Sequence, residues 1–185
     1  MAKEPERAEC VVIGGGVIGC AAAYEIARGG VKPIVLEAGH RIAEGVTSRN
    51  SGVIHAGLYY PPDSLKAQSC IRGNHLIFEW CEQAYVTHKK TGKWVVGSKA
   101  EDEELEALFK NATDSGAKGL RWAKPEELRS VGRGALSSEI GFFSENTGIV
   151  DPYEYSLSFL VRAEELGSQT LCNTKVEAIQ KIPKG

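Results

Sequence analysis

The sequence lacks the features that mark several large classes of protein. It has no apolar run long enough to span a bilayer, so we expect no transmembrane segment. Its formal net charge is only −2, which gives no electrostatic reason to expect nucleic acid or an anionic membrane as a partner. Its five cysteines are an odd number and include no C-x-x-C pair. We therefore expect reduced thiols in an intracellular compartment, with neither a disulfide framework nor a metal site.

The first residues do not resemble a targeting segment. Met1–Glu9 is short and charged, unlike a signal peptide or an arginine-rich transit peptide. We expect a cytoplasmic location by default, or a mitochondrial one if a transit peptide was removed. The 185 residues are 42% apolar and 25% charged, enough to bury the core of one domain, or of one domain and part of another.

A glycine-rich turn between a strand and a helix dominates the N-terminal part. Cys10–Ile13 is a short apolar run that predicts a strand buried on both faces. Three glycines then follow at the spacing G-x-G-x-x-G. In this motif the first glycine turns the chain, the second lets the backbone approach a pyrophosphate, and the third lets helix and strand pack closely. The predicted cofactor contacts in the motif are Gly14, Gly16, Val17, Ile18 and Gly19.

The residues after the turn complete a dinucleotide-binding unit. Residues 21–28 supply a helix whose N-terminus directs partial positive charge at the phosphate site, and two glycines end it. A second buried strand, Pro33–Leu36, leads into Glu37, 18 positions after Gly19. A carboxylate there suits the hydroxyls of an adenosine ribose and repels a 2′-phosphate. These elements predict dinucleotide binding rather than a structural turn, and they leave FAD and NAD both open.

The chain then departs from the plan of a nicotinamide dehydrogenase. Such a domain continues with another strand–helix crossover soon after the acidic residue. Here residues 38–47 form a polar loop, and residues 47–52 are dense in hydroxyls and amides. Val53–Tyr60 predicts a strand that carries His55 and stops at two prolines.

Helix and strand signals continue along the rest of the chain. Asp63 is predicted to cap a helix through residue 84, and Ser98 with Glu101 forms a capping box before another helix. Asp151, followed by proline, predicts the start of a helix that runs to about Leu166. The remaining predicted elements are strands over Lys93–Ser98, Gln169–Cys172 and Lys175–Ile179 and a short helix from Pro125.

The stretch around the histidine resembles a known family. Thr47–Pro61, followed by Ser64-Leu65-Lys66-Ala67, closely resembles the L-2-hydroxyglutarate dehydrogenase/oxidase family of the D-amino-acid-oxidase-like flavoprotein superfamily. Thr91-Gly92-Lys93 and Thr147–Asp151 match further motifs, so the resemblance covers essentially the whole chain. It implies FAD as the cofactor. It also implies an α/β fold, in which an FAD-binding Rossmann-type (glutathione-reductase-like) domain is interleaved with part of a mixed-sheet substrate domain.

The resemblance also implies domain boundaries and further site residues. Residues 1–60 and 145–185 would form the N-terminal part of the FAD-binding domain, and 61–144 would be an insertion that belongs partly to the substrate domain. Hydroxyl and amide groups before the strand suit phosphate and ribityl oxygens, and the backbone of a valine near the end would meet the adenine. The implied cofactor contacts after the glycine motif are Glu37, Ala38, Thr47, Ser48, Asn50, Ser51 and Val176.

His55 is the predicted catalytic residue. The resemblance places it beside the isoalloxazine, as general base, substrate contact or electrostatic tuner, and imidazole suits these roles because its ordinary pKa lies near operating pH. A hydrogen-bonded wall residue of the flavin pocket is the alternative, and covalent attachment of flavin is a further one. Lys66 and Arg72 could bind a substrate carboxylate, although helix positions are more often solvated.

The implied reaction is oxidation of a small 2-hydroxy acid, L-2-hydroxyglutarate, to 2-oxoglutarate by hydride transfer to flavin N5. Electrons would then pass to oxygen or a quinone. Gly52 stands where the family carries glutamate and is closer to related flavin amine oxidases of the glycine or sarcosine type, which remain an alternative. Family members are longer, so we expect an N-terminal half with exposed apolar faces, and a catalytically incomplete FAD-binding fragment is a third interpretation.

Overall fold

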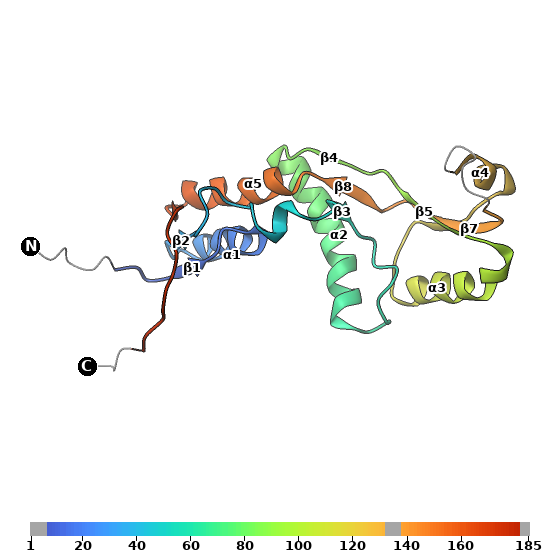
Figure 1. Cartoon of the computed structure of the whole chain (residues 1–185), viewed down its shortest axis with the longest axis horizontal. Coiled ribbons are helices and arrows are strands. Elements are labelled where there is room, and N and C mark those ends of the chain that lie inside the picture. The colour runs from blue at the N-terminus through green and yellow to red at the C-terminus, as the bar shows by residue number, and fades with distance from the viewer. Residues whose placement is uncertain (1–6, 132–137, 182–185) are drawn as a thin grey trace, which may run out of the picture. The chain divides into compact units, whose positions relative to one another are not determined.

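The computed structural model describes residues 7–131 and 138–181 in two compact units (Figure 1). Residues 1–6, on which most of the charged start falls, lie outside the described residues. The terminal unit comprises Met1–Asn50 and Asp151–Gly185, and the central unit comprises Ser51–Val150. The assignment of the predicted domains to cofactor and substrate binding remains a prediction.

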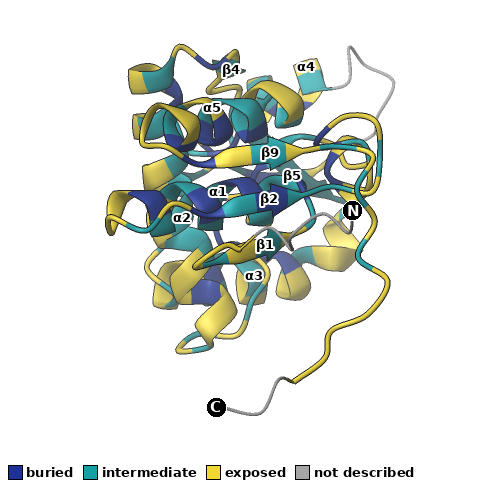
Figure 2. Cartoon of the chain, turned by 90° about the vertical axis from the view of Figure 1, so that its left-hand side faces the viewer, coloured by how far each residue is buried: buried dark blue, intermediate teal, exposed yellow. Residues whose placement is uncertain are grey.

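In its described residues, the terminal unit is a parallel sheet with two α-helices on one face. Its strands β1 (Val11–Ile13), β2 (Ile34–Leu36) and β9 (Gln169–Leu171) pair in the order β1-β2-β9. Helix α1 (Val17–Arg28) packs on β1 and β2, and α5 (Pro152–Glu165) packs on α1 and β9. Figure 2 looks onto this sheet with both helices behind it. The predicted Rossmann-type strand–helix–strand crossover is therefore confirmed.

The prediction that the first strand is buried on both faces is wrong. Val11 is 46% exposed and Ile13 is 55% exposed. Within the described part of the terminal unit, β1 is an edge strand, and the helices cover only one face of the sheet. Val35, in the central strand, is fully buried, as expected for a strand with a neighbour on each side. The expected exposure of apolar faces is found on this sheet.

Helix α5 begins and ends where its local signals predict. Asp151 Oδ1 accepts hydrogen bonds from the N–H groups of Tyr153 (2.9 Å) and Glu154 (2.8 Å), which have no partner within the helix. Gly167, just beyond the helix, has a φ of +96°, a left-handed conformation that glycine adopts without steric cost.

The strand predicted over Lys175–Ile179 does not form. After β9 the chain turns through Asn173, which has a φ of +54°. The N–H groups of Asn173 and Thr174 then donate to the carbonyls of Gly39 and Glu37, both at 2.8 Å. These bonds tie the segment to the loop after β2, so it leaves the sheet instead of continuing in it.

The described part of the central unit contains two antiparallel sheets and three α-helices. The first sheet has the order β3-β8-β4 and the second has the order β5-β7-β6. Its strands are β3 (Val53–Ile54), β4 (His88–Lys89), β5 (Lys93–Gly97), β6 (Leu120–Trp122), β7 (Ile140–Ser144) and β8 (Gly148–Val150). Its helices are α2 (Leu65–Ala84), α3 (Asp102–Asp114) and α4 (Pro125–Ser130).

An aromatic cluster fills the core beneath the second sheet. Phe142 of β7 is fully buried, and the Phe109 ring meets it edge-on with centroids 5.3 Å apart. Trp122 of β6 stacks on Phe109 at 4.8 Å. Such pairs add to the stability gained by burying apolar area. α3 contributes the buried Leu105 and Ala112 to the same core.

Helix starts in the central unit follow capping chemistry, with one correction. Ser98 and Glu101 form the predicted capping box before a short 3₁₀ turn, Lys99–Glu101, that leads into α3. The cap of α2 is Ser64 rather than Asp63, because the Ser64 hydroxyl accepts from the Ala67 N–H at 3.1 Å. Asp63 has a φ of +64°, which places it in the turn before the cap.

The strand predicted over Val53–Tyr60 is also much shorter, because only β3 pairs. Gly57, with a φ of +81°, bends the chain. Side chains from two helices then replace a strand partner. Asn74 Nδ2 donates to the His55 carbonyl at 3.0 Å, and Asn111 Nδ2 donates to two later carbonyls of the segment at 3.1 and 2.9 Å.

Glu127 gives a testable pH dependence. Its carboxylate takes both guanidinium N–H groups of Arg121, at 2.9 and 2.8 Å, and the Lys124 N–H at 2.9 Å. The Arg121 bonds, followed by the backbone bond, lower the pKa of Glu127 from 4.5 to about 2. A depressed folded-state pKa stabilises the fold above the unfolded value, and this contribution is lost as the pH falls from about 4.5 towards 2.

We therefore expect Glu127→Gln to lower the midpoint of thermal unfolding near neutral pH. The difference from the unsubstituted chain should shrink as the pH falls below the ordinary carboxyl pKa. Circular dichroism melts across that range measure it. Glu126→Gln, one position earlier and exposed, is the matched control and should change little. A Glu127→Gln deficit that is constant with pH would contradict the account.

Candidate functional site

In the glycine turn, Gly14 and Gly19 have the roles that the sequence motif predicts. Gly14 has a φ of +99°, and its N–H donates to the Leu36 carbonyl at 2.8 Å, so the turn is tied to β2. A Cβ at Gly19 would lie 1.9 Å from the Gly14 carbonyl oxygen. Only glycine at position 19 therefore lets the first turn of α1 approach the end of β1 this closely.

The N-terminus of α1 presents backbone donors. Gly16, the N-cap, has an ordinary extended conformation, and a Cβ there would lie 3.2 Å from Thr47 Oγ1. That buried hydroxyl accepts from the Val17 N–H at 3.1 Å. Among the described residues, nothing accepts from the N–H groups of Ile18 and Gly19. Two donors at the positive end of the helix are thus available to an anion.

Glu37 lies at the end of β2 beside this turn. Its Oε2 accepts from the Gly15 N–H and its Oε1 from the Gly39 N–H, both at 2.7 Å. A carboxylate has about four lone-pair sites, so these two bonds fix its orientation and leave room for two hydroxyl donors. Sequence reasoning missed Gly15 and Gly39. The middle glycine of the Gly-Gly-Gly run, and a glycine two positions after the acid, were the available signals.

The polar loop after Glu37 folds on itself. Ser48, at the end of a short 3₁₀ turn (Val46–Ser48), donates through Oγ to the Glu44 and Gly45 carbonyls at 2.9 and 3.0 Å. Asn50 Nδ2 donates to the Thr47 carbonyl. These side chains shape the loop that brings Thr47 to α1. Cofactor contacts by Ser48 and Asn50 remain predictions.

The terminal unit gathers most of the predicted cofactor contacts. The glycine turn, Glu37 and Thr47 are linked by hydrogen bonds, and Ala38 is exposed beside Glu37. Val176 is half-buried, two positions beyond the bond from Thr174 to Glu37. The unit boundary falls directly after Asn50. The two remaining residues, Ser51 and His55, therefore belong to the central unit.

His55 follows β3 directly and is exposed. Its carbonyl is held by Asn74, while its ring has no hydrogen-bond or ion-pair partner among the described residues. The backbone is therefore fixed and the imidazole is free to meet a ligand. Sequence reasoning missed Asn74 and Asn111 as supports of this segment. The available signal was an amide side chain on each of two predicted helices.

Cys20, in the first turns of α1, is a packing residue. It is fully buried, and its Sγ donates to the Gly15 carbonyl at 3.5 Å. Burial raises the pKa of the thiol to about 11, and the nearby Glu37 carboxylate adds to the increase. The thiol therefore stays protonated near neutral pH and is a poor nucleophile.

Residues 7–131 and 138–181 contain no group of three or more His, Cys, Asp or Glu side chains placed to hold a metal ion. No helix in them has the length and apolarity needed to cross a bilayer.

Comparison with known families identifies the chain. The family model of FAD dependent oxidoreductases, DAO, matches residues 9–185. The chain belongs to this family. The predicted superfamily and α/β fold class are thereby confirmed, and FAD rather than NAD is confirmed as the cofactor of the family.

The similar curated proteins are more specific. The chain is 37% identical over 178 residues to the mitochondrial L-2-hydroxyglutarate dehydrogenase of Bos taurus, covering 93% of this chain and 38% of that protein. It is 33% identical over 175 residues to the L-2-hydroxyglutarate dehydrogenase of Indibacter alkaliphilus, covering 93% and 44%. The chain thus spans about two fifths of the length of these relatives.

Solved structures agree on the fold. The L-alpha-glycerophosphate oxidase of Mycoplasma pneumoniae with FAD bound is 27% identical, with a TM-score of 0.86 over 97% of this chain and 48% of that one. The glycine oxidase of Geobacillus kaustophilus is 19% identical, with a TM-score of 0.83 over 95% and 49%. At that identity the glycine oxidase shows the fold alone.

Proposed function

We propose that the protein is an FAD-dependent enzyme that oxidises the 2-hydroxy acid L-2-hydroxyglutarate to 2-oxoglutarate. The observation that carries the proposal is the glycine turn with Glu37, in a chain whose curated relatives are named L-2-hydroxyglutarate dehydrogenase. The turn supports the binding of a dinucleotide, and the names of the relatives support the identity of the substrate.

The donor set fits FAD. The available N–H groups of Ile18 and Gly19, at the positive end of α1, suit the pyrophosphate. The fixed carboxylate of Glu37 suits the ribose hydroxyls. Thr47, next to that helix end, supplies a hydroxyl that can donate to a phosphate oxygen.

In the proposed reaction, His55 is the general base. Bound FAD supplies a hydride acceptor at flavin N5. An imidazole nitrogen of His55 would take the proton of the substrate hydroxyl, and the C–O bond would become a carbonyl as the Cα hydrogen passed as hydride to that acceptor. The exposed, unpartnered ring can reach a substrate, and its fixed backbone limits where the ring lies. Oxygen or a quinone would be the final electron acceptor.

Anaerobic titration tests this function. The purified chain is mixed with FAD, and its visible spectrum is followed as L-2-hydroxyglutarate is added, with the D enantiomer as control. We expect the oxidised-flavin band to bleach with the L acid only. Bound FAD that L-2-hydroxyglutarate does not reduce would instead support the alternative of a catalytically incomplete FAD-binding fragment. Failure to bind FAD would contradict both.

A flavin amine oxidase of the glycine or sarcosine type is the second candidate, because of Gly52. This residue has a φ of +63°, a left-handed conformation that disfavours the glutamate of the resembled family. Adding glycine and sarcosine to the same titration separates the two. Bleaching by either amine, without bleaching by the hydroxy acid, would replace the first proposal.

The cellular location also remains a proposal. Similar proteins from Bos taurus and Arabidopsis thaliana are named mitochondrial, and a cytoplasmic location is the other prediction. We propose an intracellular enzyme, and fractionation of cells that express it separates the two compartments.

A further inference from the structure

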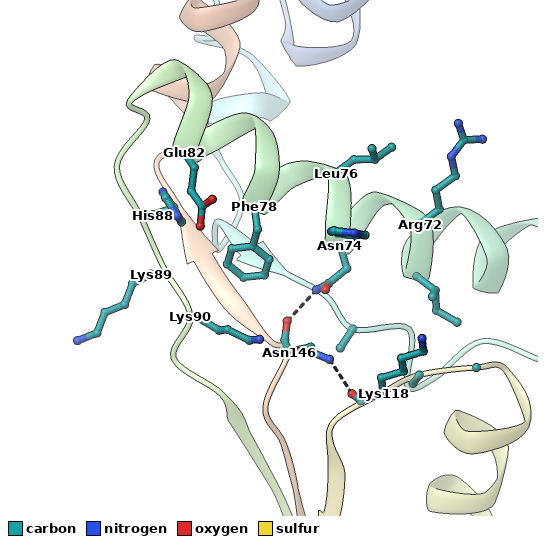
Figure 3. A pocket seen from close by; sticks show the side chains of 15 residues that line it. Arg72, Asn74, Leu76, Phe78, Glu82, His88, Lys89, Lys90, Lys118 and Asn146 are labelled. Carbon is teal, nitrogen blue, oxygen red and sulfur yellow. Dashed lines mark hydrogen bonds between the residues drawn. The ribbon is translucent and has the colours of Figure 1, made fainter.

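The central unit contains a cavity that the proposed reaction does not use. It has a volume of about 830 Å³ and lies between α2, β4 and the turn at residues 116–118 (Figure 3). Ligand pockets in proteins are typically about 300–1,000 Å³. His55 and the predicted cofactor contacts are not among its lining residues.

One wall of the cavity is apolar and fixed. It is formed by Ile71, Phe78 and Ala117. The Phe78 ring meets the His88 ring edge-on with centroids 5.9 Å apart. A Cβ at Gly148 would lie 2.6 Å from Phe78 Cζ, so the ring sits tightly against the β8 backbone. An apolar ligand surface would therefore meet a preformed aromatic face.

Two lysines supply positive charge at the other side. In Figure 3 the Lys90 side chain runs towards Asn146, and Lys118 extends towards α2, while Lys89 and Arg72 point away. In the described part of the chain, neither Lys90 nor Lys118 forms an ion pair. Glu82 lies at the opposite end from Lys118, beside His88 (Figure 3). The cavity is therefore polarised along its length.

Hydrogen bonds from two asparagine side chains hold this arrangement. Asn74 Nδ2 donates to the Asn146 carbonyl at 2.7 Å, and Asn146 Nδ2 donates to the Lys118 carbonyl at 2.9 Å (Figure 3). These bonds fasten the turn that carries Lys118 to α2. The backbone that positions the charge is thus organised before any ligand arrives.

We propose that this cavity binds a small organic anion with an apolar body. The apolar part lies against Phe78 and Ile71, and the anionic group lies between Lys90 and Lys118, where charge-assisted hydrogen bonds are available. Glu82 repels the anionic group from the other end and so sets one orientation.

Titration with 1-naphthalenesulfonate, followed by methyl NMR of isoleucine, tests the site. Ile71 reports from the cavity, and Ile13, on the exposed sheet of the terminal unit, reports unspecific binding to an apolar face. The double variant Lys90→Gln/Lys118→Gln removes the proposed charges. Lys99→Gln/Lys110→Gln removes the same charge from exposed positions outside the cavity. Circular dichroism confirms that each variant is folded.

We expect a saturable shift of the Ile71 methyl signal. Its dissociation constant should rise about tenfold in Lys90→Gln/Lys118→Gln and stay unchanged in Lys99→Gln/Lys110→Gln. The neutral 1-naphthol should bind more weakly, and neither double substitution should change its dissociation constant. No shift at Ile71, equal weakening in both double variants, or naphthol binding as tightly as the sulfonate would each overturn the proposal.

Discussion

Replacing Gly19 by alanine is expected to weaken FAD binding strongly and to destabilise the terminal unit. The new Cβ would lie 1.9 Å from the Gly14 carbonyl oxygen and 3.4 Å from a methyl of Val12. Both the helix and the turn that present backbone donors would have to move apart. Overpacking of this kind costs about 1–3 kcal/mol, and we expect an FAD affinity at least about 100-fold lower. Thermal melts and FAD fluorescence titration measure the two effects.

Gly73→Ala is the matched control. Gly73 lies within α2, and apart from its chain neighbours and the backbone of its own helix no atom is within 4 Å of the position its Cβ would take. Alanine is the better helix former, so this variant should gain up to about 1 kcal/mol and bind FAD unchanged. Helix propensity alone predicts stabilisation at position 19 as well. A Gly19→Ala variant that is as stable as Gly73→Ala would therefore contradict the close contact.

Replacing His55 by alanine is expected to slow flavin reduction by L-2-hydroxyglutarate while FAD stays bound. Loss of a general base costs about 10²–10⁴-fold in rate. The exposed ring has no partner among the described residues, so the melting temperature should hardly change. Anaerobic stopped-flow measurements of flavin reduction in the variant and in the unsubstituted chain give the two rates.

His40→Ala is the control for this measurement. His40 is 70% exposed and pairs with Glu44 at 3.1 Å in the terminal unit. In the His40→Ala variant, L-2-hydroxyglutarate should reduce the flavin as fast as in the unsubstituted chain. Unchanged kinetics in His55→Ala would return His55 to the role of a pocket wall. Acid precipitation addresses the covalent alternative, because flavin that stays with the unsubstituted protein and is released from His55→Ala would show attachment at this residue.

Local chemistry was readable in the sequence. The spacing of Gly14 and Gly19 predicts the turn, and Asp151 before a proline predicts the start of α5, because each feature involves groups only a few residues apart. The prediction of the family came from the run of residues around His55, which no local physical rule would have produced. Cofactor contacts by individual residues remain predictions from that resemblance.

Contacts across long sequence separations were not readable. Asn111 bonds to carbonyls more than 50 positions away, which turns a predicted strand into a segment held by a helix. Ser64 replaces Asp63 as a cap because the backbone of Asp63 adopts a left-handed turn.

The sequence by itself therefore determined a dinucleotide-binding crossover and its family. Glycine spacing and capping residues act through contacts between residues close in sequence, so the turns and helix ends that they form depend little on the rest of the fold. Only the tertiary structure decided that β1 is exposed, that Gly15 and Gly39 hold Glu37, and that Lys90 and Lys118 line one cavity. Burial and the positions of charges depend on which distant segments pack together, and the hydrophobic pattern of a single segment does not predict this packing.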